Sequence, residues 1–184
     1  MRIGIDISQI VYEGSGVGRI VRSLVAAMVT GDQKNDYILF GSSLRLRPKI
    51  ISYFNSLKSR HSKIRLVVLP LPPTVLDFVW NKLHIFPIEW LVGPVDVFWS
   101  SDWTQPPLAS AKGVTTVHDL AVLRYPESFT GKIVSVQKRR LKQVARECSA
   151  IFCDSAATLA DCRALLGISM DKLHVVYPGL SQLL

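Results

Sequence analysis

Short apolar runs alternate with helix-forming segments along nearly the whole chain, and this alternation limits its fold more than any other feature. The runs are about five residues long and rich in β-branched residues; they lie at residues 2–7, 37–40, 64–69, 95–99, 113–117, 150–153 and 173–176. Helical spacing of apolar residues predicts helices at residues 17–28, 48–57, 130–148 and 156–166, and a helix broken at Pro87 within residues 75–91. Strands that alternate with helices form βαβ units. We therefore expect one Rossmann-like α/β domain spanning residues 1–184, a parallel sheet of about seven strands with helices on both faces.

Composition narrows the classes of partner. The 184 residues are 48% hydrophobic and 20% charged, which is typical of a folded globular chain. The formal net charge of +8 fits nucleic acid, an anionic membrane surface or phosphorylated substrates. The sequence has neither an aromatic-and-basic ribonucleoprotein signature nor zinc-finger spacing, so we expect no nucleic-acid partner.

The cysteines and the N-terminus indicate a cytoplasmic protein. The chain enters a strand directly after Met1 and carries Asp6 where a signal peptide would be apolar. No run approaches the ~18 apolar residues of a membrane span. The three cysteines lack CxxC spacing, so we expect reduced, packed thiols and no metal site.

A glycine-rich stretch at residues 13–19, Glu-Gly-Ser-Gly-Val-Gly-Arg, follows the first strand and opens the first helix. The free N–H groups of a helix start favour a phosphate or carboxylate, which makes this loop a candidate binding site. Its candidate residues are Gly14, Gly16, Val17, Gly18 and Arg19. A plain tight turn is the alternative. The pattern is neither GxGxxG nor a P-loop, and no acidic residue follows the second strand, so a nicotinamide cofactor is disfavoured.

The fifth strand, residues 113–117, ends abruptly in the polar pair His118 and Asp119. Parallel α/β sheets place their ligands at the carboxyl ends of strands, so this pair is a candidate for chemistry. The alternative is a loop histidine held by a neighbouring carboxylate.

Two further polar stretches would open onto the same edge. Residues 100–107 follow the fourth strand and contain Trp103, which either stacks on a sugar face or caps the core. Ser155 follows the sixth strand and is most simply the N-cap of the next helix, a role compatible with ligand contact.

Two segments raise the question of a surface partner. Residues 75–91 carry Phe78, Trp80, Phe86 and Trp90, and we expect core packing rather than a surface facing a membrane or an acceptor. The helix at residues 130–148 is expected to bury Ile133, Gln137, Leu141, Val144 and Cys148, and to expose Lys132, Lys138, Arg139, Arg140, Lys142 and Arg146. A solvated face is the default, and peripheral contact with an anionic membrane at its inner face is the alternative.

Taken together, these stretches resemble the N-terminal half of the family-four retaining glycosyltransferases of GT-B fold, with the nearest likeness to mannosyltransferase-like members. The matching pieces are residues 3–6, 16–19, 116–120, 125–127, 151–155 and 172–179, in the family's order and spacing.

The resemblance implies two Rossmann-like domains facing across a cleft, with this chain as the acceptor-binding half. The donor-binding C-terminal domain, a further partner, would be absent from the chain, and the half would be inactive alone. Substrates would be a nucleotide sugar such as a GDP- or UDP-sugar and a glycan or lipid-linked acceptor, with no cofactor. Residues 14–19 would lie against the donor diphosphate or the acceptor. His118 would contact the donor sugar, Asp119 would orient His118 or the loop, and Ser155 would lie toward the acceptor.

A different class of function explains the glycine loop and the charge equally well. This alternative is a non-catalytic Rossmann-like module that binds a phosphorylated small molecule.

Overall fold

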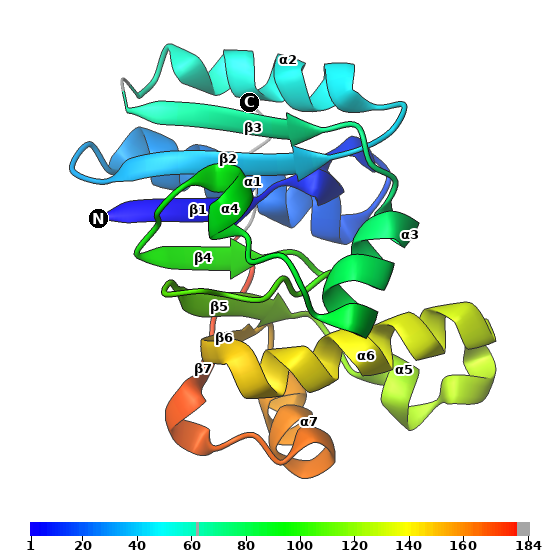
Figure 1. Ribbon diagram of the computed structural model, residues 1–184. Helices are drawn as coiled ribbons and strands as arrows, with labels where there is room; N and C mark the ends of the chain where they lie inside the picture. The colour runs from blue at the N-terminus through cyan, green and yellow to red at the C-terminus, as the bar shows by residue number, and fades with distance from the viewer. Residues whose placement is uncertain (62, 180–184) are drawn as a thin grey trace.

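A single parallel sheet of seven strands forms the centre of the molecule, in the order β3-β2-β1-β4-β5-β6-β7 (Figure 1). The computed structural model describes residues 1–61 and 63–179. The strands are β1 (Arg2–Asp6), β2 (Asp36–Ser42), β3 (Ile64–Leu69), β4 (Val97–Ser100), β5 (Lys112–Val117), β6 (Cys148–Cys153) and β7 (Leu173–Val175). All six neighbouring pairs are parallel. The predicted Rossmann-like α/β class is confirmed.

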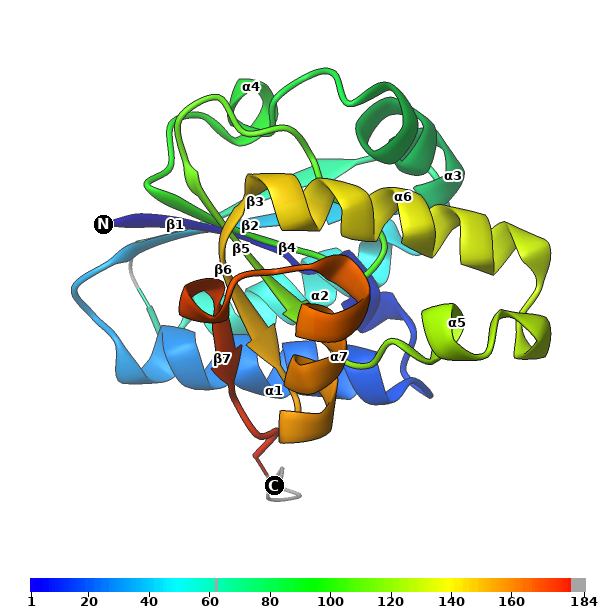
Figure 2. The ribbon, with the colours of Figure 1, turned by 90° about the horizontal axis from the view of Figure 1, so that it is seen from below.

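Helices cover both faces because the chain reverses its direction across the sheet. From β1 it moves outward to β3, and the right-handed crossovers place α1 (Gly16–Gly31) and α2 (Arg47–Lys58) on one face. It then returns to β4 and moves outward to β7, which places the later helices on the other face (Figure 2). These are α3 (Pro73–Leu76), the π-helical η2 (Asp77–Leu83), α4 (Glu89–Val92), α6 (Gly131–Glu147) and α7 (Ala156–Leu166). The short helix α5 (Ala121–Arg124) lies beyond the carboxyl end of β5, and 3₁₀ turns occur at η1 (Ser8–Val11), η3 (Pro126–Ser128) and η4 (Met170–Lys172).

Apolar side chains pack on both faces of the sheet, as expected for buried parallel strands. Ile5 and Leu39 contact α1 and α2 on one face, while Phe40 and Phe98 contact η2 and α4 on the other. A third cluster joins β5 and β6 to α6 and α7 and includes all three cysteines. All three cysteines are free and buried, as predicted.

The prediction for residues 75–91 is wrong in its packing. Of the four aromatic residues, only Trp80 is buried, with 1% of its surface exposed. Phe78, Phe86 and Trp90 are 49%, 52% and 70% exposed. Helical spacing shows that a segment has an apolar face, but it does not show what covers that face.

The assignment of faces on α6 is also partly wrong. Arg140, expected on the solvated face, is 1% exposed, and Ile133 and Gln137 are only half-buried. The helix instead turns Val136, Arg140, Leu141, Gln143 and Val144 inward. The rotation follows from a buried cation that finds polar partners at the strand ends, described below.

Candidate functional site at the carboxyl edge of the sheet

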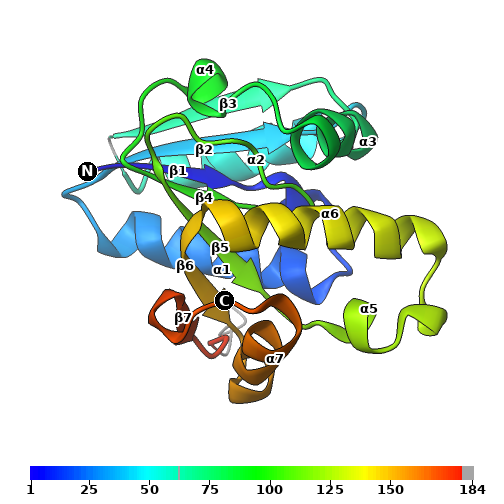
Figure 3. The ribbon, with the colours of Figure 1, turned by 60° about the horizontal axis from the view of Figure 1, so that its bottom comes forward.

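All the predicted site residues follow the carboxyl ends of strands, so the structure places them along one edge of the sheet (Figure 3). The strand order reverses between β1 and β4, and the crevice beyond such a reversal is where open α/β sheets bind ligands. The glycine loop follows β1, and the loop of Trp103 follows β4. His118 follows β5, and Ser155 follows β6. Since only β4 lies between β1 and β5, about 10 Å separates these two strands across the sheet.

The glycine loop divides into a structural and an open part. Ser15 is the N-cap of α1, and its Oγ accepts a hydrogen bond from the N–H of Gly18 at 2.9 Å. A Cβ on Gly18 would lie 2.8 Å from the carbonyl oxygens of Gln9 and Tyr12, so this glycine is needed for packing. A Cβ on Gly14 or Gly16 would meet nothing within 4 Å, which leaves their backbone open to a ligand.

The two remaining residues of the loop have different environments. Val17 is half-buried against the core beneath α1, so its role is packing. Arg19 is exposed in the first turn of α1. It is the charged side chain of residues 14–19 that a ligand at this helix start could reach.

His118 is held in place from two sides. Its Nδ1 lies 2.7 Å from Asp154 Oδ2, and the two side chains are only 14% and 19% exposed. Its backbone carbonyl accepts a hydrogen bond from Thr158 Oγ1 at 3.1 Å. A carboxylate at Nδ1 favours the tautomer protonated there, so Nε2 is the ring atom available to a ligand. In the described part of the chain, Nε2 has no hydrogen-bond partner.

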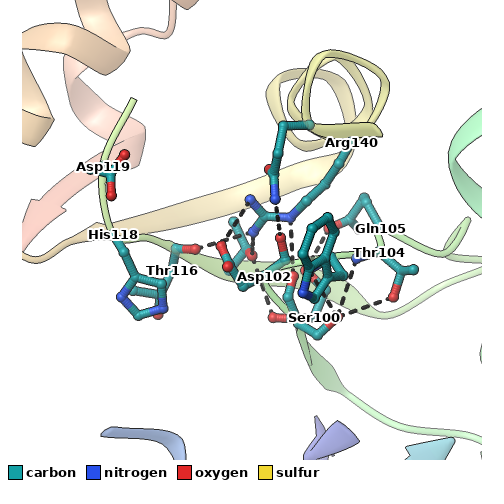
Figure 4. Close-up of polar contacts among 12 residues, drawn as sticks. Ser100, Asp102, Thr104, Gln105, Thr116, His118, Asp119 and Arg140 are labelled. Carbon is teal, nitrogen blue, oxygen red and sulfur yellow. Dashed lines mark hydrogen bonds and ion pairs between the residues drawn. The ribbon is translucent and has the colours of Figure 1, made fainter. Parts of the chain in front are cut away.

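Asp119 orients the loop and not the imidazole. Its Oδ1 accepts a hydrogen bond from the N–H of Ala121 at 2.8 Å, at the start of α5. Figure 4 shows the Asp119 and His118 side chains pointing away from one another. Of the two groups that Asp119 was expected to orient, His118 or the loop, its hydrogen bond reaches the loop. The carboxylate that holds His118 is Asp154.

Ser155 caps α7 as predicted. Its Oγ accepts a hydrogen bond from the N–H of Thr158 at 3.0 Å, and the same Thr158 contacts the His118 carbonyl. The cap of α7 and the position of His118 are thus joined through one threonine.

Arg140 is buried beneath the edge and ties together the ends of β4 and β5 (Figure 4). Its Nε donates to the Ser101 carbonyl at 3.1 Å, and one Nη donates to Thr115 Oγ1 at 2.8 Å and to the Thr116 carbonyl at 3.1 Å. Burial lowers the pKa of the guanidinium, and the Asp102 carboxylate, 3.7 Å from Nη1, acts in the opposite direction. Guanidinium groups remain protonated in proteins, so a fixed positive charge lies beneath the site.

Trp103 belongs to a polar loop whose side chains satisfy one another. Ser100 Oγ donates to Gln105 Oε1 at 2.6 Å, and the hydroxyls of Ser101 and Thr104 lie 3.1 Å apart. Trp103 is half-buried and borders a small hollow between this loop and η1. The half-buried indole is therefore compatible with both predicted roles, stacking on a sugar face and capping the core.

Asp6 ends β1 directly under the glycine loop. It is 4% exposed, and its Oδ1 accepts a hydrogen bond from the N–H of Ser8 at 2.9 Å. Its Oδ2 is buried and has no hydrogen-bond partner among the described residues. Burial raises the pKa of this carboxyl above its usual value.

Sequence reasoning missed three residues of this site: Asp6, Arg140 and Asp154. Asp6 and Asp154 carried a usable signal, because each comes at the carboxyl end of a predicted strand, as His118 does. Arg140 carried none, because it stands in a basic run on a helix.

Within residues 1–61 and 63–179, no group of three or more His, Cys, Asp or Glu side chains is placed to hold a metal ion. A larger open depression lies at the opposite, amino edge and is lined by Arg2, Lys63 and Arg65 among others.

Comparison with known proteins identifies a family, and it also finds a weak likeness among solved structures. Among solved structures, a short-chain dehydrogenase from Oenococcus oeni matches with 14% identity and a TM-score of 0.42, a likeness too low to carry an argument. The match covers 86% of this chain and 60% of the dehydrogenase. Among proteins of curated function, no match is found. The family model described as Glycosyltransferase Family 4 matches residues 14–181, and the chain therefore belongs to this glycosyltransferase family.

Proposed function

We propose that this chain is the acceptor-binding half of a retaining glycosyltransferase of GT-B fold. It would act with a donor-binding domain, its partner in the complete enzyme, and be inactive without it. The donor would be a nucleotide sugar such as a GDP- or UDP-sugar, and the acceptor a glycan or lipid-linked sugar. The observation that carries the proposal is that a chain of this family brings an open glycine turn and an anchored imidazole to one sheet edge.

Transfer of the sugar develops charge on two groups, the leaving diphosphate and the sugar itself. Departure of the diphosphate leaves negative charge, which backbone N–H groups at a helix start and nearby cations stabilise. The N–H groups come from the open backbone at Gly14 and Gly16 at the start of α1, and the cation is the exposed Arg19. The sugar passes through an oxocarbenium-like state, as in glycoside cleavage.

His118 would contact the donor sugar through Nε2. Asp154 keeps the ring in one orientation and one tautomer, so Nε2 can accept a hydrogen bond from a sugar hydroxyl without reorganisation in the transition state. Asp119 would shape the adjoining loop, Ser155 and Trp103 would border the acceptor, and we propose no covalent intermediate.

Turnover of the complete enzyme tests the proposal. In the protein that carries this domain with a donor-binding domain, His118→Ala should lower kcat by about 10²-fold or more, the typical loss for removing one positioned hydrogen-bonding group of the transition state. His174→Ala is the control, because this exposed histidine lies on β7 away from the crevice. Unchanged kcat in His118→Ala would remove the residue from the mechanism.

Transfer and binding assays on the same protein distinguish an enzyme from a non-catalytic binding module. Sugar transfer by the wild-type protein with retained anomeric configuration supports the glycosyltransferase. Binding of phosphorylated sugars with no transfer to any acceptor would favour the non-catalytic module instead.

A further inference from the structure

We propose that the segment of η2 and α4 is an interfacial membrane-docking surface that places Phe86 and Trp90 among lipid headgroups. The inference rests on this surface alone and is independent of the proposed function. In the described residues, no helix is both long and apolar enough to cross a bilayer. The proposed contact is a surface attachment in which aromatic side chains enter the headgroup region.

The first observation is the exposure of large apolar side chains in one short segment. Trp90 is 70% exposed, Phe86 is 52% exposed, and their rings lie 5.9 Å apart in an edge-on arrangement. Other large apolar residues of the segment are more than a third exposed: Phe78, Leu83, Ile85 and Leu91. Scattered single exposures are normal on a protein surface, but a concentration within fourteen residues marks an interaction site.

The second observation is that the backbone is strained to hold this arrangement. His84 and Phe86 have φ angles of 54° and 63°, the left-handed region that a bulky aromatic residue avoids. The loop between them is fixed by hydrogen bonds from Trp80 Nε1 to the Phe86 carbonyl at 3.1 Å and from the Ile85 N–H to the Val79 carbonyl at 3.2 Å. Strain maintained by surrounding contacts is typical of functional positions. Here it holds Phe86 toward solvent.

The third observation is charge. Arg139 on α6 pairs with Asp77 of η2 at 2.6 Å, so this flank of α6 adjoins η2. Lys142 and Arg146 follow three and seven residues later, which places them on the same flank, and both are exposed. Lys82 is exposed on η2 itself, 5.3 Å from the centre of the Phe78 ring.

The acidic groups beside the surface are already occupied. Asp77 pairs with Arg139, and Glu147 lies 3.1 Å from His84. Glu89 accepts hydrogen bonds from three consecutive backbone N–H groups at residues 109–111. The surface therefore presents aromatic rings beside unneutralised cations, the combination that binds an anionic membrane interface.

The position of α4 argues against a second domain as the occupant of its aromatic side. Helix α4, which carries Trp90, lies toward the amino ends of the strands, whereas η2 lies toward their carboxyl ends, beside the loop of Trp103 (Figure 1). A domain that closes over the site would leave Trp90 free. The proposed contact differs from a membrane contact through the basic helix α6 alone, because the aromatic segment of η2 and α4 supplies its apolar part.

Vesicle co-sedimentation tests the docking surface. We expect the wild-type protein to bind phosphatidylcholine vesicles that contain phosphatidylglycerol, to bind pure phosphatidylcholine vesicles weakly, and to lose binding as salt is raised. Phe86→Ser with Trp90→Ser should weaken binding by about 10-fold or more, because two aromatic side chains no longer leave water. The control pair is Leu165→Ser with Met170→Ser, which has similar exposure on α7 and η4 and should bind as the wild type does.

A fluorescence measurement locates the contact. Trp80 and Trp99 are buried and Trp103 is half-buried, so brominated acyl chains should quench chiefly Trp90. Trp90→Phe should keep vesicle binding and lose most of the quenching.

Three outcomes would overturn the proposal: no binding to anionic vesicles at low salt, equal loss in the control pair, or undiminished quenching in Trp90→Phe. A Phe86→Ser/Trp90→Ser protein that keeps vesicle binding but loses self-association would also overturn it, in favour of a protein occupant.

Discussion

At the scale of single residues, the buried polar groups of the site differ in whether they have a hydrogen-bond partner. His118 is anchored by a carboxylate, while Asp6 has one carboxyl oxygen without a partner among the described residues. The hydrogen bond to the carboxylate holds the His118 ring in one orientation. At Asp6, the buried carboxyl without a second partner couples its protonation to folding.

Asp6 should make stability depend on pH in a direction opposite to most carboxylates. Because burial raises its folded-state pKa, its protonated form favours the folded state. That stability is fully present below the unfolded-state pKa and is lost as pH rises through the folded-state pKa. Relative to Asp6→Asn, the wild-type free energy of unfolding should therefore fall as pH rises from acid to neutral. Urea titrations at several pH values measure this difference, and a constant difference would contradict it.

Arg140 should be among the most costly residues to remove. Arg140→Ala leaves a cavity and deprives the Ser101 and Thr116 carbonyls of their donor. We expect a loss of about 3–5 kcal/mol in the free energy of unfolding, the range for removing one partner of a buried charged network. Lys138→Ala, an exposed change on the same helix, should cost under about 0.5 kcal/mol. Chemical denaturation compares the two, and similar losses would show that Arg140 does not hold the strand ends.

At the scale of elements, the start of α1 combines a packing contact and an open turn in three residues. Gly18 approaches two carbonyl oxygens of the preceding loop, whereas Gly16 faces open space. The same residue type therefore serves two purposes that mutation can separate.

Gly18→Ala should lower stability by about 1–3 kcal/mol, because the new methyl group overpacks the loop. Gly16→Ala should leave stability within about 0.5 kcal/mol or raise it, because alanine favours the helix. In the complete enzyme, however, Gly16→Ala should raise KM or lower kcat if the donor diphosphate lies against that backbone. Thermal unfolding and steady-state kinetics on both variants give the answer. A stable Gly16→Ala enzyme with unaltered kinetics would show that no ligand approaches this turn.

The elements show how far sequence reasoning reaches. Alternating strand and helix patterns predicted all seven strands and the parallel class of the sheet, because buried strands and amphipathic helices have distinct periods. Residues 75–91 were harder, because a π-helical turn and a strained loop break the helical period there. Exposure of Phe86 and Trp90 depends on tertiary packing that no local pattern records.

At the scale of the whole molecule, the site is a product of topology. His118 and the glycine loop could be assigned to one edge from the sequence, because both follow strands of a parallel sheet. The pairing of His118 with Asp154 could not, because it joins the ends of two different strands across thirty-six residues. The buried Arg140 likewise depends on how α6 is rotated against β4 and β5.

We propose two separate functional surfaces on the molecule, the carboxyl edge of the sheet for substrate chemistry and the exposed aromatic segment of η2 and α4 for membrane contact. Substitutions at one surface should leave the other unaffected: Phe86→Ser with Trp90→Ser should keep kcat toward a water-soluble acceptor within about 2-fold, because distant sites act additively. A large loss of kcat with that acceptor would show that the two surfaces are coupled.

A structure of the complete enzyme with its nucleotide sugar bound tests the central claim most directly. We expect the sugar within hydrogen-bond reach of His118 Nε2 and the diphosphate against the backbone of Gly14 and Gly16. A donor bound instead in the depression at the amino edge, beside Arg2 and Arg65, would contradict it.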